Sequence, residues 1–345
     1  MPKVNKYKRV ILGIALTMLY STACLYAQDL HFSQYNNSPL NLNPSQTGLF
    51  NGDWRFMGNY RTQWSSIPVP YNSYSIATDT RLKTKLLNDV PAVGLVINTD
   101  KAGDSRFTTT QILLSGSFVK KLSNDSVHFV SIGVQPGITT RNFNTTDLTF
   151  DNQYDGDQYN AALGSGENFS KTRITYFDFG AGLSYLFKKN ERTRINLGFA
   201  GFHLNKPKQS YFDNKEIRLD AKTTLHCLAQ FPVSANVDVL PSFMIQQQGK
   251  YNETLIGLFG KYYLKPIDGM STAIAIGAFQ RIRDAFIVKI SVDYRNFNFG
   301  LSYDITTSKL RRANNSRGAL EISLVYVFKK IVPFVAKKRV CPIYM

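Results

Sequence analysis

The stretch from Thr175 to Phe187 reads TYFDFGAGLSYLF and decides the fold. Side chains of a β-strand point alternately to its two faces. One face of this stretch is apolar and aromatic, with Phe177, Phe179, Ala181, Leu183, Tyr185 and Phe187. The other face is mostly small or polar, with Tyr176, Asp178, Gly180, Gly182, Ser184 and Leu186. An apolar face that ends in aromatic residues is typical of a strand in a transmembrane β-barrel.

The same alternation recurs along most of the chain and predicts fourteen strands. They are Trp54–Trp64, Tyr71–Arg81, Val90–Asp100, Phe107–Lys120, Val127–Thr140, Arg173–Phe187, Arg194–Asn205, Ala221–Phe231, Ala235–Gln247, Glu253–Tyr262, Thr272–Gln280, Ala285–Asp293, Phe297–Ile305 and Gly318–Phe328. Bacterial single-chain barrels have an even number of strands. Because an unpaired strand edge in lipid is costly, the first and last strands must pair. The sequence therefore predicts an all-β, antiparallel outer-membrane β-barrel over residues 54–328.

Composition alone does not decide between this barrel and a soluble β-sandwich. The mean hydropathy is −0.20 and 13% of the residues are aromatic, which suits both. The connections favour the barrel. The longest ones, Arg141–Thr172, Lys206–Asp220 and Thr306–Arg317, all follow odd-numbered strands, whereas short turns follow even-numbered strands. Since barrels have long extracellular loops and short periplasmic turns, we expect both the N- and C-termini to be periplasmic.

The middle strands alternate less cleanly than the others. In Glu253–Tyr262, the charged residues Glu253 and Lys261 share a face with Leu255 and Phe259. We interpret this face as the lipid face, with the two charges at the membrane edge.

The first residues predict export. Lys3, Lys6, Lys8 and Arg9 precede an apolar run from Val10 to Tyr20, and small residues follow up to Ala27. This is the pattern of a signal peptide over residues 1–27, with cleavage between Ala27 and Gln28. Lipoprotein processing at Cys24 is the alternative. Cleavage would lower the formal net charge from +17 to +13, because the signal carries four positive charges.

An exported protein with this excess of positive charge is not expected to bind nucleic acid. We expect contact with anionic lipid head groups or an acidic partner instead. Part of this positive charge lies in the tail 329–345, which contains Lys329, Lys330, Lys337, Lys338 and Arg339. The tail either contacts lipid phosphates or an acidic neighbour, or only keeps the protein soluble. Cys227 and Cys341 remain after cleavage; they are either a disulfide or, as we prefer, two free thiols.

The width of the barrel raises the question of what fills it. Barrels of about eight strands are filled by side chains, and porins of about 16–18 strands hold a water channel. A barrel of intermediate size needs a plug or a guest. The segment Gln28–Asp53 is rich in Asn, Ser and Pro and has no strand pattern, so it is either that plug or a periplasmic tail.

Candidates for catalysis are few. The histidines His31, His128, His203 and His226 have no metal-ligand spacing, and no nucleophile elbow or phosphate-binding loop is present. We predict no enzymatic activity and no cofactor. Asp151, Asp155 and Asp157 in DNQYDGDQYN could hold Ca²⁺, but they lack the EF-hand pattern, so a solvated loop is the alternative. The long exposed connection still makes Asp151, Tyr154, Asp155, Asp157 and Tyr159 candidates for binding a protein partner.

The mature N-terminus, QDLHFSQYNNSPLNLNPSQTGLFNGDWRFMGNYRTQW, resembles the start of the PorP/SprF family of type IX secretion proteins of Bacteroidota. The resemblance continues in PYNSYSIATDTRL, GLVINTDKAGDS, FDNQYDGDQYN, YFDFGAGLSYLF, FNFGLSYDITTSKL and GALEISLVYVF, and ends at Cys341-Pro342. It covers essentially the whole mature chain.

The resemblance implies an outer-membrane barrel that serves secretion or surface attachment of a cognate large adhesin, in some members linked to gliding motility. It also implies association with periplasmic components of the secretion machine, and it supplies no catalytic residues. We therefore expect a barrel that holds the C-terminal domain of a secreted adhesin in its lumen or on its outer loops. A passive solute channel is the alternative function.

Overall fold

The computed structural model describes residues 29–330, except 65–68, 83–88, 124, 146–147, 168–170, 212–215, 268–269, 310 and 315. The predicted signal peptide, its cleavage site at Ala27 and Gln28, Cys24, Cys341 and the tail beyond Lys330 lie outside the described residues. No helix in the described part of the chain is long and apolar enough to cross a membrane.

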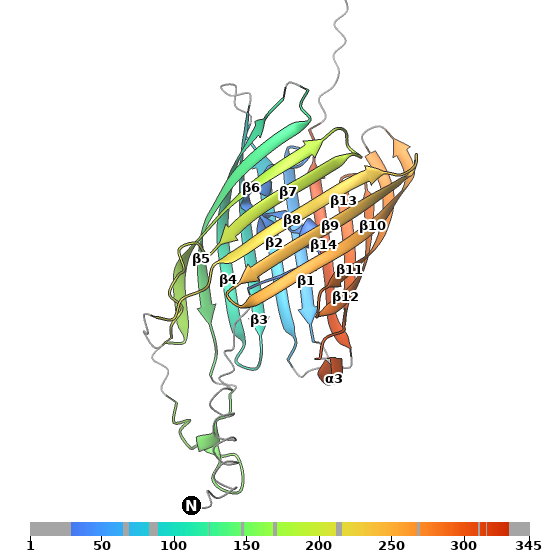
Figure 1. Cartoon of the computed structure of the whole chain (residues 1–345). Coiled ribbons are helices and arrows are strands. Elements are labelled where there is room, and N and C mark those ends of the chain that lie inside the picture. Colours follow the sequence, from blue (N-terminus) through green and yellow to red (C-terminus); the bar gives the residue numbers. More distant parts are fainter. Residues whose placement is uncertain are drawn as a thin grey trace, which may run out of the picture.

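The described residues form fourteen antiparallel strands in one closed barrel (Figure 1). The strands are β1 (Trp54–Gln63), β2 (Tyr71–Arg81), β3 (Val90–Ala102), β4 (Phe107–Lys121), β5 (His128–Asn142), β6 (Arg173–Lys188), β7 (Arg194–Phe202), β8 (Lys222–Pro232), β9 (Val237–Gln248), β10 (Tyr251–Ile267), β11 (Met270–Arg281), β12 (Ala285–Tyr294), β13 (Phe297–Thr306) and β14 (Arg317–Phe328). Each strand pairs with its neighbours in sequence, and β1 closes the barrel against β14 from Trp54↔Phe328 to Gln63↔Ala319. The predicted barrel and its strand number are confirmed.

Most strand ends lie within two residues of the prediction, and two differ by three residues or more. β7 ends at Phe202 and not at Asn205, because His203 and Lys206 have left-handed φ angles of 55° and 43° that leave the strand. β10 continues past Tyr262 to Ile267, with a register shift between Tyr263 and Lys265. A proline is tolerated in a strand at a bulge, and the register shift lies directly before Pro266, so the ladder runs on to Met270.

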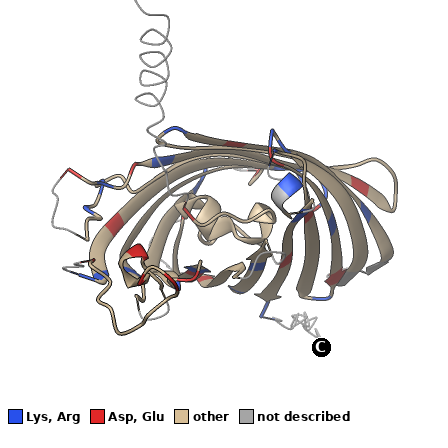
Figure 2. Cartoon of the chain, turned by 90° about the horizontal axis from the view of Figure 1, so that it is seen from below, with Lys and Arg blue, Asp and Glu red and all other residues tan. Residues whose placement is uncertain are grey.

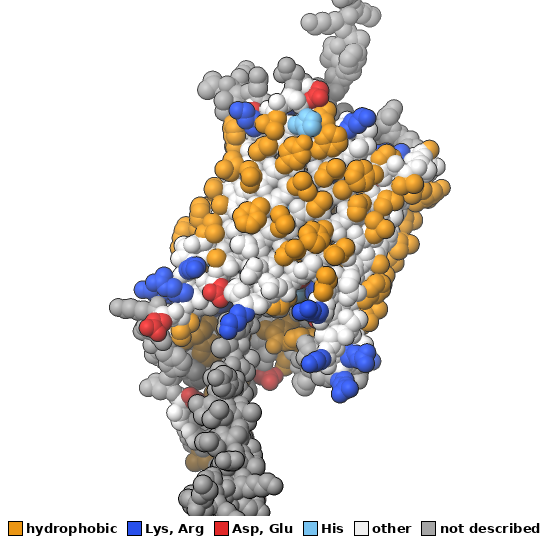
Figure 3. Space-filling view, in the orientation of Figure 1, with side chains coloured by type: hydrophobic (Ala, Val, Ile, Leu, Met, Phe, Trp, Pro, Cys, Tyr) orange, Lys and Arg blue, Asp and Glu red, His pale blue; other side chains and the backbone are white. Residues whose placement is uncertain are grey.

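The outer surface is rich in exposed apolar side chains, and Figure 3 shows them spread over the side of the barrel that faces the viewer. Ile76 and Leu114, for example, are 69% and 61% exposed on this surface. Aromatic residues flank it at both ends, as in membrane barrels. Trp54, Phe56 and Tyr326 stack near the start of β1, and Trp64 meets Tyr71 edge to face where β1 ends. In the opening stretch, Phe177 and Leu183 are exposed on the outside, as predicted.

The two ends of the barrel differ. The long connections 143–172, 203–221 and 307–316 all lie at one end, which we call the loop mouth. Six short connections lie at the other end, the turn mouth. The connection 143–172 extends well beyond the strands and contains the short helix η3 (Asp151–Gln153), whereas α3 (Arg311–Asn314) lies in 307–316 (Figure 1).

Residues 29–53, the lumenal segment, lie inside the barrel. The segment contains three short helices, η1 (Tyr35–Asn37), α2 (Pro39–Leu42) and η2 (Pro44–Gln46). Figure 2 looks along the barrel and shows these helices within the ring of strands. Asp29 bonds to the start of β8 at the loop mouth, and Asp53 meets the end of β14 at the turn mouth. The first and last described residues, Asp29 and Lys330, thus lie at opposite mouths. The two termini themselves lie outside the described residues, so their periplasmic location stays a prediction.

The interpretation of β10 is wrong. Leu255 and Phe259, assigned to the lipid face, are 0% and 5% exposed inside the barrel, together with the buried Glu253. The lipid face of β10 carries Ile256, Leu258, Tyr262 and Leu264, which are about half exposed. The inner face is apolar because it packs against the lumenal segment, so both faces of this strand are apolar and alternation cannot separate them.

Candidate functional site

The strongest attachment of the lumenal segment is a buried cluster of charged groups near the loop mouth. The Glu321 carboxylate accepts the backbone N–H groups of Ser33 and Gln34 at 2.8 and 2.9 Å. Arg61 bridges Glu321 at 3.1 Å and Asp304 at 2.9 Å. The Ser33 hydroxyl also lies within hydrogen-bond distance of Asp304, at 2.8 Å. Both carboxylates and the Arg61 guanidinium are almost fully buried, so each charge depends on the others for solvation.

Arg281 enlarges the same cluster. Its guanidinium bonds to Glu253 at 2.8 Å and to Asp304 at 3.0 Å, and donates to Ser33 Oγ at 2.7 Å. The side chains come from β1, β10, β11, β13 and β14, so closure of the barrel brings them together. Charge-assisted hydrogen bonds are about twice as strong as neutral ones, which makes this cluster the main anchor of the segment.

The middle of the segment is held by amides and hydroxyls. Asn43 caps η2 by accepting the Ser45 N–H at 2.9 Å, and Pro44 occupies the first turn, where its missing N–H costs nothing. Ser45 Oγ lies 2.5 Å from Ser184 Oγ, and Gln46 Nε2 donates to the same Ser184 oxygen at 2.7 Å. Ser184 of the opening stretch thus binds the segment.

Glycines in the wall allow this close approach. A Cβ atom on Gly133 would lie 2.5 Å from the Pro44 carbonyl carbon and from the Ser45 nitrogen. On Gly182 it would overlap the Asn43 side chain. Any side chain at these positions would push the segment away from the wall. The small inner face of Thr175–Phe187 therefore receives the chain's own N-terminal segment.

Apolar contacts complete the fit. Tyr35 and Leu42 of the segment pack in a buried cluster with Met244, Leu255, Phe259, Ala275, Phe279 and Ile287 of the wall. Leu40 packs in a second cluster with Met57, Ala77, Val96 and Leu113. Burying a leucine side chain stabilises by about 1.5–3 kcal/mol, so these contacts add to the polar anchor.

Near the turn mouth, Asp79 forms a second charged anchor. Its carboxylate pairs with Arg55 at 2.7 Å and accepts the Gly48 N–H at 2.7 Å. Arg55 also donates to the Gln46 carbonyl oxygen at 3.0 Å and lies over the Phe50 ring. The segment is thus fixed at both ends.

At the loop mouth, Asp29 sits in an ionic latch, formed with Lys222 and His203. Lys222 Nζ bonds to Asp29 at 2.6 Å, and His203 contacts Asp29 at 3.2 Å and Asp178 at 2.7 Å through its two ring nitrogens. Burial alone would raise the pKa of Asp29 and lower the pKa of His203. Even so, Lys222 and His203 hold the pKa of Asp29 well below its ordinary value, and the carboxylates of Asp29 and Asp178 raise the pKa of His203. Two carboxylate partners require two ring N–H donors, which only the charged imidazolium has.

The candidate partner-binding residues all lie in the connection 143–172. Tyr154 and Tyr159 form an isolated antiparallel bridge and are 58% and 50% exposed. Asp155 accepts the N–H groups of Asp157 and Gln158 at 3.0 and 2.9 Å, and these bonds lower its pKa. Asp151, Asp155 and Asp157 are exposed, and no metal-binding group of three or more His, Cys, Asp or Glu side chains is found among the described residues.

The remaining sequence candidates do not converge. His203 lies in the latch, His128 contacts Tyr185 near the turn mouth, and His226 and His31 line different parts of the lumen. Cys227 is a free, partly buried thiol. Sequence reasoning did not identify the anchoring residues Arg61, Arg281, Asp304 and Glu321. The available signal was a charged residue at an inward position of each of the strands that carry them.

The comparisons with known proteins agree with a membrane barrel. The family model described as "Type IX secretion system membrane protein PorP/SprF" matches residues 25–326. No curated protein matches the sequence.

Solved structures also match. The chain is similar to the CymD monoaromatic hydrocarbon channel, with 11% identity, a TM-score of 0.46, and 88% of this chain and 95% of that chain covered. It is similar to the P. putida toluene transporter TodX, with 11% identity, a TM-score of 0.46, and 86% and 95% covered. It is also similar to a Pseudomonas aeruginosa FadL homologue, with 10% identity, a TM-score of 0.45, and 83% and 93% covered.

Proposed function

This chain belongs to the PorP/SprF family of type IX secretion system membrane proteins, and on that premise we propose that it supports secretion or surface anchoring of a cognate large adhesin. The chain is an outer-membrane β-barrel. We propose that it acts without catalysis, by binding the C-terminal domain of that adhesin. The family resemblance supports a role beside one adhesin, in gliding or in secretion.

One observation carries the proposal further: the chain's own lumenal segment runs through the barrel from one mouth to the other, while a long loop stays exposed. The anchors at Glu321 and Asp79 hold the lumenal segment along the barrel. A guest domain in the lumen would have to displace it. The connection 143–172, with exposed Tyr154, Tyr159 and Leu163, projects from the loop mouth and is free of such constraints. We therefore place the adhesin contact on this loop.

This placement sets the orientation. If the loop mouth faces outward, the connections 143–172, 203–221 and 307–316 meet secreted cargo, and the short turns face the periplasm. Barrels of the outer membrane have this asymmetry. The latch at Asp29 then lies at the cell surface, and Lys330 lies on the periplasmic side, where other secretion components would contact this end of the barrel.

Gene deletion tests the proposal in cells. Surface display of one neighbouring adhesin should be lost, while other cargo is unaffected. Complementation with a chain in which residues 151–163 are replaced by a Gly-Ser linker should leave the barrel in the membrane without restoring display. The matched control replaces exposed residues of α3, Arg311→Ser and Arg312→Ser, at the same mouth. Equal loss of all cargo after deletion would contradict a dedicated role.

A passive solute channel is the second candidate, favoured by an open cavity of about 1080 Å³ at the turn mouth. The lumenal segment, which is anchored at both mouths and lies in the path of any solute, argues against a channel. Purified protein in planar bilayers should be silent, and steady conductance would favour the channel.

A further inference from the structure

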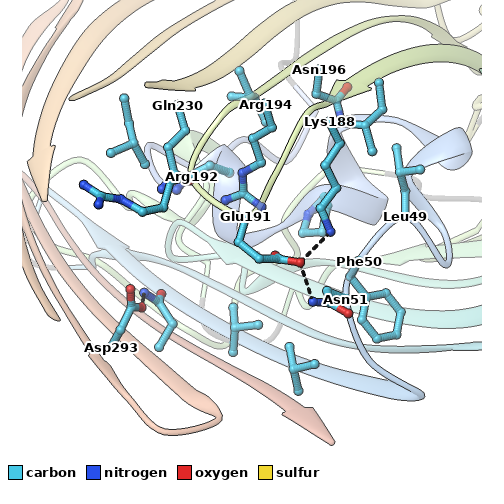
Figure 4. A pocket seen from close by; sticks show the side chains of 18 of the residues that line it. Leu49, Phe50, Asn51, Lys188, Glu191, Arg192, Arg194, Asn196, Gln230 and Asp293 are labelled. Atoms are coloured by element: carbon cyan, nitrogen blue, oxygen red, sulfur yellow. Dashed lines mark hydrogen bonds and ion pairs between the residues drawn. The ribbon is translucent and has the colours of Figure 1, made fainter. Parts of the chain in front are cut away.

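The cavity at the turn mouth is a chamber built from wall and lumenal segment together; we call it the vestibule. Its volume is about 1080 Å³. Its floor includes Leu49, Phe50 and Asn51 of the lumenal segment, and its walls come from the turn-side halves of the strands. Figure 4 shows Lys188 and Asn51 meeting at the Glu191 carboxylate, with Asp293 on another wall.

The vestibule is strongly basic. Nine lysine and arginine side chains line it against two carboxylates, Glu191 and Asp293. Both carboxylates are already paired, Glu191 with Lys188 at 2.8 Å and Asp293 with Lys261 at 2.5 Å. Arg192, on the rim, pairs with the buried Asp238.

Five of the lining cations have no carboxylate within ion-pair distance in the described part of the chain. They are Arg81, Lys121, Arg194, Arg295 and Lys329. Arg81 is held against Phe50 and the Gly48 carbonyl oxygen, whereas Lys121, Arg194 and Lys329 are exposed. A concave site lined by one sign of charge attracts an oppositely charged ligand, because its low-dielectric walls focus the field.

We propose that the vestibule binds an acidic, partly apolar polypeptide segment of a partner protein. The apolar side chains among the charges, including Leu49, Phe50, Phe129 and Leu240, would contact its apolar residues. The chain's own tail is unsuited, since residues 329–345 carry five Lys and Arg and no Asp or Glu. Lipid head groups are unsuited too, because the vestibule opens from the lumen and not from the apolar outer face. The size, at the upper end of small-molecule pockets and open on one side, fits an extended segment.

This binding site is separate from the adhesin contact proposed above, since it lies at the opposite mouth. Charge reversal of Lys121 and Arg194 should therefore affect it alone. Both side chains are exposed and lack ion pairs among the described residues, so reversal removes no buried contact. The matched control is Arg311→Glu with Arg312→Glu on α3, which reverses the same number of exposed cations at the loop mouth.

The test is a binding titration on the full mature chain in detergent, read by fluorescence anisotropy. The probe is a labelled peptide of Glu and Leu residues, and the same peptide with Lys for Glu is the negative probe. The acidic peptide should bind, and Lys121→Glu with Arg194→Glu should weaken it by about tenfold or more, while the α3 control does not. Added salt should also weaken the binding of the acidic peptide to the wild-type chain, because it screens the charges on both.

Three results would overturn the assignment. They are no binding of the acidic peptide, equal weakening by the α3 control, or full displacement of the peptide by inorganic phosphate, which would assign the vestibule to small anions. Adhesin display in cells is measured independently, so failure here leaves the loop proposal intact.

Discussion

Glu321→Gln should release the lumenal segment while leaving the barrel folded. The side chain of Glu321 is fully buried, and its two oxygens accept N–H groups from Ser33, Gln34 and Arg61 at 2.8, 2.9 and 3.1 Å. Glutamine has the same shape but offers one acceptor oxygen and one NH₂ donor. Whichever way the amide turns, an N–H group of the segment or of Arg61 then faces another donor.

The size of the effect follows from these contacts. Breaking a buried ion pair by removing one partner costs about 3–5 kcal/mol, and this range already includes the donor left without an acceptor. With about 1.4 kcal/mol for each factor of ten, the ratio of docked to released segment should fall by about two to three and a half orders of magnitude. The remaining anchor at Asp79 limits release to the N-terminal half of the segment.

Two measurements follow this change. Hydrogen exchange by mass spectrometry should show faster exchange in a peptide covering residues 29–38, with the strands unchanged. Planar bilayers should show intermittent conductance where the wild type is silent. The control is Glu191→Gln. The Glu191 side chain is 65% exposed, so its ion pair with Lys188 contributes less than about 1 kcal/mol. Unchanged exchange in Glu321→Gln, or the same response in both variants, would refute the anchoring role.

Three further predictions test the packing, the latch and the strand faces. Gly133→Ala inserts a methyl group against the backbone of the lumenal segment and should destabilise its docking by about 1–3 kcal/mol. Gly116→Ala is the control, because a Cβ at this position would have nothing within 4 Å. Hydrogen exchange of the lumenal segment should be faster in the first variant only. Because the pKa of His203 is raised in the folded chain, the latch has its full stability below about pH 6.5 and loses it as the pH rises through that raised pKa. Hydrogen exchange of the Asp29 amide should therefore become faster over this pH range. The variant His203→Gln should lack this pH dependence. Leu258→Lys places a charge on the lipid face and should cost about 2–4 kcal/mol in a refolding titration into lipid vesicles.

The sequence predicted the outer surface well because lipid imposes a strict rule on it. Every second residue facing hydrocarbon must be apolar, so Phe177 and Leu183 in β6 or Phe299 and Leu301 in β13 can be assigned from alternation alone. Strand ends were less certain, because turn residues such as Pro266 are tolerated at a bulge.

The inner surface follows no such rule. Its composition depends on what it touches, and the contact partners lie far apart in sequence: Glu321 meets Ser33 across 288 residues. The apolar inner face of β10 looked like a lipid face because Leu255 and Phe259 pack against Tyr35 and Leu42. The charges at Arg61, Asp304 and Glu321 fit the alternation as ordinary inward polar residues, and nothing in the pattern marks them as one cluster.

The distribution of anchors predicts a lumen that stays closed at rest. The segment is tied near the loop mouth through Glu321 and near the turn mouth through Asp79, and between them it lies against Gly133 and Gly182 with no space to slide. Moving it along the barrel would break both ionic anchors at once, and leaving a buried charge unpaired costs several kcal/mol for each. Thermal motion alone therefore rarely opens the lumen. Any partner that passes through it must first replace these contacts with its own, whereas a partner on the loop or in the vestibule binds without that cost.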